Sequence, residues 1–295
     1  MSVVLITGAA TGIGNLTAHA LAAAGHTVFA SMRDPAGRNA TRAQQLLDAA
    51  QRDGLDLRVV ELDVTSQDSA DAAVATVLDQ AGQLDVVVHN AGHLVLGYVE
   101  AFTAEDIAHL LDVNALGVQR VNRAALPYLR ARRSGTLVYV GSTTTVVVPP
   151  FLGPYVVSKF AFDALAQTTA YEVSQFGIET SIVMPGAFTS GTEHFPNAGR
   201  ASDQDVTAAY SALDPLVARN EEATAGLLAP GADADPVTVA EEITRILALP
   251  VGAKPLRSVV DFTQSGVEEV NTVAAKAQDS FVSRLGFTQL LHLQH

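Results

Sequence analysis

The sequence predicts an α/β protein built on a doubly wound parallel sheet with helices on both faces. Short runs rich in Val, Ile and Leu alternate with longer stretches of helical spacing, which is the pattern of repeated βαβ units. Most of the runs are nearly continuous in apolar residues rather than apolar at every second residue, as in parallel strands buried on both faces. A glycine-rich turn joins the first run to the first helical stretch.

The expected elements alternate along the chain. The strands are predicted at Val3–Ile6, Thr27–Ser31, Leu57–Glu61, Leu84–His89, Thr136–Gly141 and Glu179–Met184, with Arg257–Phe262 as one more. The helices are predicted at Asn15–Ala24, Gln67–Ala81, Glu105–Arg132 and Tyr155–Phe176. Residues 189–235 mix turn residues with short helical patches and carry no strand signal, which indicates a substrate lid. We expect one domain over residues 1–262, followed by a helical extension over 263–295.

Composition narrows the function classes. The chain has 295 residues, 48% of them hydrophobic, which is enough for a sizeable core. A net charge of −13 disfavours nucleic acid and acidic lipid surfaces as partners. The absence of cysteine excludes disulfides and thiolate catalysis, and the eight histidines have no paired metal-ligand spacing, so we expect no metal. Neither a signal peptide nor a membrane span is expected, and we predict a cytoplasmic protein.

The glycine-rich turn predicts a dinucleotide site. It occupies residues 7–14 and leads directly into a helix. Glycines let the backbone approach a pyrophosphate, and the helix N-terminus presents free N–H groups and a positive dipole. We predict that Gly8, Thr11, Gly12, Ile13 and Gly14 bind the cofactor. The alternative is a tight turn without a ligand.

The end of the second strand indicates which cofactor is used. An acidic residue there would bind the ribose 2′-hydroxyl of NAD, whereas an arginine suits the 2′-phosphate of NADP. Arg33 stands at this point, after Met32, and a guanidinium can bind a phosphate with two hydrogen bonds. Asp34 would repel a phosphate, and a surface Arg33–Asp34 pair without a cofactor role is the alternative. We predict NADP(H), with NAD(H) as the other option.

A second motif predicts carbonyl–alcohol chemistry. Tyr155 and Lys159 are four residues apart, so on a helix they share one face. A nearby cation favours the phenolate, so we expect Lys159 to lower the Tyr155 pKa and allow proton transfer. Ser142 follows a predicted strand, at the carboxyl edge where α/β sheets bind ligands, and its hydroxyl can hydrogen-bond a substrate oxygen.

An apolar substrate pocket is expected beside these residues. Neutral or apolar side chains follow several strand ends and continue into the lid, which favours a hydrophobic ketone, aldehyde or secondary alcohol. Their packing on one another is the alternative. The residues expected to line the pocket are His93, Leu94, Thr144, Phe151, Phe188 and Phe195.

These motifs, in this order and at these spacings, resemble the short-chain dehydrogenase/reductase family, in its single-domain branch. The resemblance implies that Asp63 and Val64 contact the adenine and that Asn114 holds a water near Lys159. It also assigns cofactor contacts to Asn90, Ala91, Gly92, Tyr155, Lys159, Pro185 and Gly186. For the carboxamide it leaves Thr189, Ser190 and Thr192 open. His89 stands where the family usually has a first asparagine, which is a departure from its pattern.

The resemblance implies hydride transfer between NADPH and a carbonyl carbon, with Tyr155 as acid or base, Ser142 positioning the oxygen, and Lys159 assisting. Two alternatives stay open at this point. One is an NAD-dependent alcohol dehydrogenase on the same fold, and the other is a regulator that senses a dinucleotide without turnover. The family commonly forms dimers or tetramers through two helices, so a homodimer or homotetramer is expected.

Overall fold

A single parallel sheet organises the computed structural model, which describes residues 1–228 and 231–294. The strand order is β3-β2-β1-β4-β5-β6-β7, so the chain reverses its direction of progress between β1 and β4. This confirms the predicted doubly wound sheet. The strands are β1 Val3–Ile6, β2 Thr27–Met32, β3 Leu57–Glu61, β4 Val86–His89, β5 Gly135–Val140, β6 Ile178–Pro185 and β7 Arg257–Val260.

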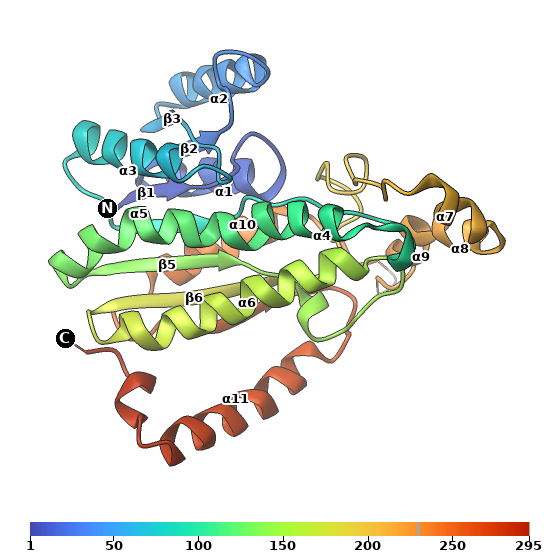
Figure 1. Cartoon of the computed structure of the whole chain (residues 1–295). Coiled ribbons are helices and arrows are strands. Elements are labelled where there is room, and N and C mark those ends of the chain that lie inside the picture. Colours follow the sequence, from blue (N-terminus) through green and yellow to red (C-terminus); the bar gives the residue numbers. More distant parts are fainter. Residues whose placement is uncertain (229–230, 295) are drawn as a thin grey trace.

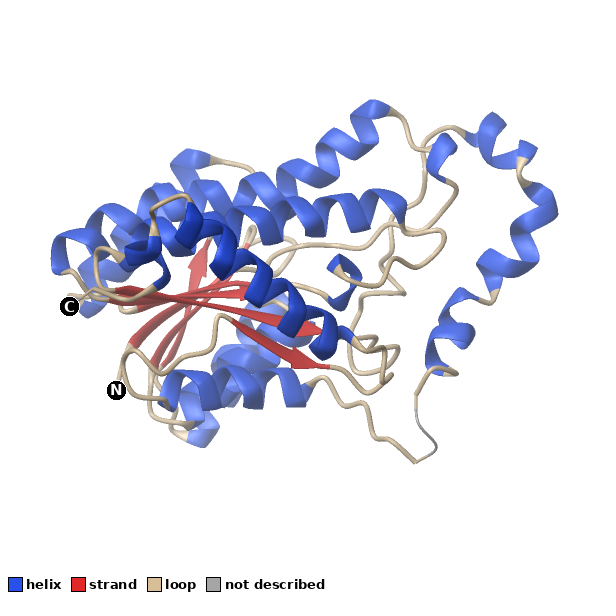
Figure 2. Cartoon of the chain, turned by 90° about the horizontal axis from the view of Figure 1, so that it is seen from below, coloured by secondary structure: helices blue, strands red, loops and turns tan. Residues whose placement is uncertain are grey.

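Helices cover both faces of the sheet, with strands between them (Figure 2). Two separate apolar clusters fill the space, one on each face, and every strand from β1 to β6 contributes to one or both. The first face carries α3 Gln67–Ala81, α5 Gly117–Arg132 and α6 Gly153–Ser174. The second carries α1 Gly12–Ala23, α2 Ala40–Asp53 and α10 Val237–Ala248.

The stretch predicted as one helix over Glu105–Arg132 is interrupted. It consists of α4 Ala104–Leu111, a π-helical turn over Asp112–Leu116, and α5. A π-helical turn is one residue wider than an α-helical turn and is frequent near functional sites. Here it contains Asn114, one of the predicted site residues.

The segment predicted as the lid lies over the carboxyl end of the sheet and projects away from it (Figure 1). Its described part contains α7 Gln204–Ala209, a 3-10 turn Ser211–Leu213, α8 Asp214–Ala218 and α9 Asn220–Ala225. Two tyrosines tie it to the loop after β4. The Tyr98 hydroxyl donates to Asp214 (2.7 Å), and the Tyr210 hydroxyl donates to Glu100 (2.5 Å). The lid is therefore fixed to the body by side-chain contacts.

The chain ends in α11 Val267–Arg284 and a 3-10 turn over Thr288–Leu291, as the predicted extension implies. In Figure 1, α11 lies below α6 and diverges from it along its length. The final residues return to the C-terminal end of α6, where the Gln294 backbone N–H donates to the Ser174 carbonyl (2.9 Å). Within residues 1–228 and 231–294, no helix combines the length and the apolar composition needed to cross a bilayer.

Candidate active site

A cavity of about 1050 Å³ opens at the carboxyl edge of the sheet. It is lined by the segments that follow β1 to β6, with lid residues 192–195 above them. Ligand pockets for small molecules reach roughly 1,000 Å³. The cavity therefore has room for more than a drug-sized molecule, and its place at the reversal of strand order is where α/β sheets bind ligands.

The glycine-rich turn forms one end of the cavity. Gly8 has a φ of 68°, and a Cβ there would lie 2.8 Å from the Ala91 Cα, so only glycine fits. Asn90 holds the turn from below, because its amide donates to the carbonyls of Thr7 and Gly8 (3.0 Å each). The turn and the loop after β4 are thus locked together.

The first turn of α1 is suited to an anion. Thr11 precedes the helix but its side chain makes no capping hydrogen bond, and no acidic residue lies in the first turn. Thr11, Gly12 and Ile13 line the cavity. Uncapped N–H groups and the positive helix end face the cavity here, and a phosphate satisfies both.

Three arginines line the cavity beyond this turn: Arg33, Arg38 and Arg42. Asp34 does not oppose them. Its backbone adopts a left-handed φ of 46°, and its carboxylate accepts the Arg38 backbone N–H (2.9 Å). Arg42 is already paired with the lid residue Glu193 (2.9 Å), so Arg33 and Arg38 are the cations available for a ligand phosphate.

The charges of Arg33 and Arg38 also act on the carboxyl of Asp63. Burial raises the pKa of its carboxyl, but hydrogen bonds from Thr65 and the charges of Arg33 and Arg38 outweigh burial and hold the pKa below its usual value. Asp63 and Val64 both line the cavity. The ends of β2 and β3 therefore form one charged, hydrogen-bonding wall.

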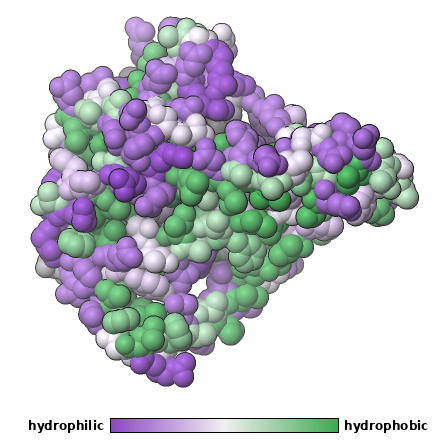
Figure 3. Space-filling model, in the orientation of Figure 1, coloured by the Kyte–Doolittle hydropathy of each residue, from purple (hydrophilic) through white to green (hydrophobic). Residues whose placement is uncertain are grey.

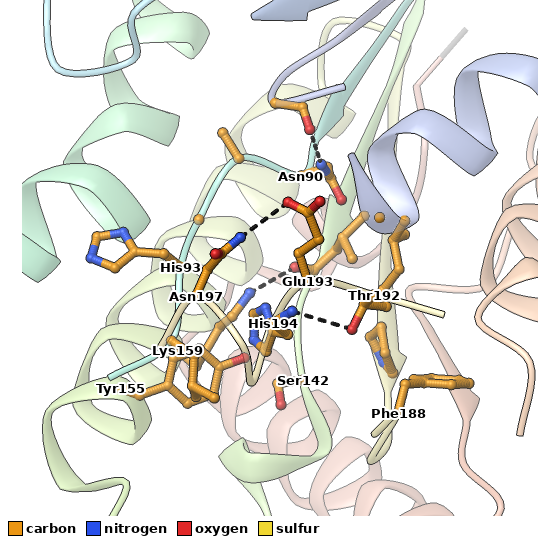
Figure 4. Close-up of a pocket in the computed structure, with 18 of the residues that line it drawn as sticks. Asn90, His93, Ser142, Tyr155, Lys159, Phe188, Thr192, Glu193, His194 and Asn197 are labelled. Atoms are coloured by element: carbon orange, nitrogen blue, oxygen red, sulfur yellow. Dashed lines mark hydrogen bonds between the residues drawn. The ribbon is translucent and has the colours of Figure 1, made fainter. Parts of the chain in front are cut away.

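Tyr155, Lys159 and Ser142 meet at the other end of the cavity (Figure 4). Tyr155 and Lys159 lie one turn apart near the start of α6, and Ser142 directly follows β5. The Lys159 ammonium donates to the Val140 carbonyl (3.0 Å) and lies 5.9 Å from the centre of the Tyr155 ring. The Ser142 hydroxyl accepts from the Thr144 hydroxyl (2.9 Å).

Burial dominates the proton equilibria of this group. It raises the pKa of Tyr155 to about 12, and the neighbouring Ser142 hydroxyl offsets only part of the rise. It lowers the pKa of Lys159 to about 8. The expected lowering of the Tyr155 pKa by Lys159 is therefore not found, because burial, which disfavours the phenolate, is the dominant influence on Tyr155. At neutral pH, Tyr155 carries its proton.

The Asn114 side chain does not line the cavity, and its role in holding a water near Lys159 stays a prediction. Its amide donates to the His93 carbonyl (3.0 Å) and the Ser158 hydroxyl (2.9 Å), and its oxygen accepts the His93 N–H (3.0 Å). All of these contacts are used to fix the loop after β4 against α6. A contact between Asn114 and a water near Lys159 would have to come from its main chain.

Most of the other predicted residues line the cavity, and four do not. Gly14 lies behind the turn, where a Cβ would meet the Asn90 amide at 2.4 Å. Phe151 turns toward Tyr98 and packs edge-on against its ring (6.0 Å between centroids). Thr189 and Ser190 lie outside the lining. The residues found in the lining as predicted are Gly8, Thr11, Gly12, Ile13, Arg33, Asp63, Val64, Asn90, Ala91, Gly92, His93, Leu94, Ser142, Thr144, Tyr155, Lys159, Pro185, Gly186, Phe188 and Phe195.

Several cavity residues were not foreseen from the sequence, among them Arg38, Arg42, Glu193 and His194. The available signal was the recurrence of arginine after the second strand, at Arg38 in the turn before α2 and at Arg42 in its first turn. The lid residues follow a turn at Gly191, whose φ is 71°, and no regular element fixes their register. Of the three hydroxyl residues considered for the carboxamide, Thr189, Ser190 and Thr192, only Thr192 lines the cavity.

Comparisons with known proteins agree with this architecture. Residues 2–201 match the family described as short chain dehydrogenase. A 3-ketodihydrosphingosine reductase of Bacteroides thetaiotaomicron is 32% identical over 214 residues, which cover 72% of this chain and 74% of that protein. The 17-beta-hydroxysteroid dehydrogenase type 1 of Mus musculus is 37% identical over 193 residues, and the match covers 63% of this chain but only 54% of that relative, about half its length.

Solved structures are similar over nearly the whole chain. A short-chain dehydrogenase from Streptomyces avermitilis has 27% sequence identity and a TM-score of 0.72, with 97% of each chain covered. An actinorhodin polyketide ketoreductase solved with NADPH has 25% identity and a TM-score of 0.71, with 90% of this chain and 97% of that one covered.

Proposed function

The chain belongs to the short-chain dehydrogenase family and is an NAD(P)-dependent oxidoreductase of that type, and from this premise we propose that it uses NADP(H) to interconvert a carbonyl and a secondary alcohol on a largely apolar small molecule. The observation that carries the proposal is the continuous cavity, which has Tyr155, Lys159 and Ser142 at one end and the glycine-rich turn with Arg33 at the other.

The lining fits a nicotinamide dinucleotide phosphate. The uncapped first turn of α1 suits the pyrophosphate. Gly8 and Gly12, which adopt a positive φ, have no side chain that would block its approach. Arg33 and Arg38 suit a 2′-phosphate, and the acid on that loop, Asp34, is hydrogen-bonded to the Arg38 backbone N–H. When bound, the cofactor supplies or accepts the hydride.

The protein's own residues account for the proton. Tyr155, protonated at neutral pH, donates to the oxygen of the substrate as charge develops on it. Ser142 donates a second hydrogen bond to that oxygen and orients it. Lys159 holds a positive charge beside Tyr155 and stabilises the phenolate that forms. With a pKa near 12, Tyr155 carries at neutral pH the proton that reduction of a carbonyl requires.

The names of the relatives support a large apolar substrate. They include reductases or dehydrogenases of 3-ketodihydrosphingosine, hydroxysteroids and retinol. In this chain the substrate end of the cavity is lined by Leu94, Val147, Val148, Phe188 and Phe195. These side chains favour burial of an apolar body next to the reacting carbonyl.

In this proposal residues 1–262 form the catalytic unit, 189–235 act as its substrate lid, and 263–295 are an appended helical extension. The two tyrosine contacts of the lid, from Tyr98 and Tyr210, support a segment that holds a defined position over the cavity. Limited proteolysis tests it: cofactor and substrate together should slow cleavage within 189–235, and unchanged cleavage would contradict the assignment.

We also propose that the chain forms a homodimer or homotetramer through α5 and α6. Hydrophobic residues gather over α6 and its neighbours on the face shown in Figure 3. Leu116, Val157 and Phe160 are each about half exposed there. Phe160→Arg should lower the molar mass measured by light scattering, and a wild-type monomer would refute the assembly.

The test of function combines binding and turnover. We expect the purified protein to bind NADPH more tightly than NADH, as followed by nicotinamide fluorescence, and to oxidise NADPH when apolar ketones are added. Tyr155→Phe should keep NADPH binding and lose turnover. Binding without turnover of any carbonyl by the wild type would favour a dinucleotide sensor instead, and preference for NADH would overturn the assignment of Arg33.

A further inference from the structure

His194 is the lid residue nearest to the reacting groups. Its ring lies edge-on against the ring of Tyr155, with 5.7 Å between the centroids and an angle of 76° between the planes. Figure 4 shows its side chain above Ser142 and beside Tyr155, on the lid loop that lies over the cavity. No motif in the sequence assigns it a role, and the mechanism above does not use it.

Hydrogen bonds hold the lid loop around His194. Its backbone N–H donates to the Thr192 hydroxyl (3.4 Å). The preceding residue, Glu193, accepts hydrogen bonds from Arg42 on α2 (2.9 Å) and from Asn197 (3.0 Å). The Arg42 contact ties the lid to the body next to the imidazole, and the other two contacts lie within the lid.

The imidazole has hydrogen-bonding capacity left over. Among the residues that the structure describes, only the backbone of His194 takes part in a hydrogen bond, and its ring lines the cavity. By contrast, both ring nitrogens of His89 are sealed inside the protein beside Tyr139. A neutral imidazole offers one donor and one acceptor, so the His194 ring, as part of the cavity lining, can hydrogen-bond a ligand there.

The surroundings of the His194 ring favour a ligand oxygen over a cation as its binding partner. Burial first, and then the charges of Lys159 and His93, lower the pKa of His194 to about 4, so the ring is neutral at neutral pH. The one carboxylate on the adjoining lid residue, Glu193, is occupied by Arg42. Positive neighbours and a free N–H together suit a partially negative oxygen.

We propose that His194 is a specificity-determining residue, which donates a hydrogen bond to a second oxygen on the substrate, one or two carbons from the reacting carbonyl. The rings of Tyr155 and His194 are in contact, so the two oxygens that they bind must belong to neighbouring parts of one molecule. The inference rests on the proposed function and narrows it from apolar ketones to ketones with an adjacent oxygen substituent.

A matched pair of substrates isolates the second oxygen. Ethyl 3-oxohexanoate and nonan-4-one have chains of equal length with the ketone at the same place, but only the first carries ester oxygens. We expect His194→Phe, which keeps an aromatic ring against Tyr155, to lower kcat/KM for the ester roughly tenfold and to leave the ketone within about twofold. Because each variant is compared on both substrates, the greater intrinsic reactivity of the ester cancels.

Two further variants separate recognition from packing. His194→Gln retains a donor and should restore most of the ester preference. His292→Phe is the matched control, because His292 lies on the C-terminal segment beside the far end of α6. This variant should leave kcat/KM unchanged for both substrates. An equal loss on both substrates in His194→Phe would mean that the ring only supports Tyr155, and no loss on either would mean that it touches no substrate. Both results would overturn the proposal.

Calorimetry tests the same contact without turnover. With enzyme saturated with NADP⁺, the Kd for ethyl 3-oxohexanoate should rise roughly tenfold in His194→Phe while the Kd for nonan-4-one stays constant. An unchanged ester Kd would overturn the role of His194. Failure of the proposed function is distinguishable, since it would appear as wild-type protein that binds these ligands yet reduces neither, whatever residue stands at 194.

Discussion

Removal of the Arg33 guanidinium should weaken NADPH binding selectively. A hydrogen bond to a charged group is worth about 1.5–3 kcal/mol, and 1.4 kcal/mol corresponds to a factor of ten in Kd. Arg33 and Arg38 are both exposed, so solvent screening should place the binding energy that each contributes near the lower limit of this range. We therefore expect Arg33→Ala to raise the Kd for NADPH about tenfold and Arg33→Ala/Arg38→Ala about a hundredfold, with NADH changed less than about threefold.

Nicotinamide fluorescence titrations measure both constants on the same protein samples. Arg52→Ala is the control, since Arg52 lies at the last turn of α2, is 70% exposed and pairs with Asp53 away from the cavity. It should leave both Kd values unchanged. Raising the salt concentration should reduce the NADPH preference of the wild type and not that of the double variant. Equal losses of NADPH and NADH affinity in Arg33→Ala would refute the assignment of this loop to the 2′-phosphate.

Three other predictions concern the proton, the fold and the turn. The rate of reduction should fall above pH 8, because Lys159 is charged below its pKa of about 8 and neutral above it; a kcat/KM profile flat to pH 10 would contradict this. Lys254→Met should lower the free energy of unfolding by about 3 kcal/mol in urea titrations, because it leaves the Glu179 carboxylate buried without its cation; Lys254→Met/Glu179→Leu should recover most of the loss, and a cost below about 1 kcal/mol for the single variant would refute the argument. Gly8→Ala should weaken NADPH and NADH alike, at least tenfold in fluorescence titrations, since the new Cβ meets Ala91 in a left-handed backbone; unaltered binding would show that the turn does not hold the cofactor.

The sequence was sufficient wherever burial or helical periodicity dictates the structure. The strands β1 and β3 and the helix α3 begin and end at the predicted residues. For β1 the reason is burial, because a strand covered on both faces has to be apolar along its whole length. The missed helix α10 carried a similar signal, with Val239, Ile243 and Ile246 buried at helical spacing against α1. Its absence from the prediction reflects an overlooked pattern rather than a missing one.

The site was predictable where residues belong to regular elements. Tyr155 and Lys159 share a helical face, and Ser142 directly follows a strand, so sequence spacing sets their separation. In the lid no such rule applies. The positive φ at Gly191 shifts which hydroxyl faces the cavity and brings His194 over Tyr155, and both depend on tertiary contacts that a spacing cannot reveal.

Proton equilibria were also beyond the sequence. The motif alone suggests that Lys159 lowers the Tyr155 pKa, whereas the structure buries both groups and so favours their neutral forms. Burial depends on the packing of α6 beneath the lid, which only the folded chain defines.

Transfer of label from cofactor to product tests the central claim most directly. The protein would be incubated with a ketone and NADPH deuterated at the transferable C4 position, and the alcohol analysed by mass spectrometry. We predict one deuterium on the carbinol carbon with the wild type and almost no labelled alcohol with Tyr155→Phe, although that variant still binds NADPH. Oxidation of NADPH without deuterium in the alcohol, or equal labelling by both proteins, would contradict carbonyl reduction at Tyr155.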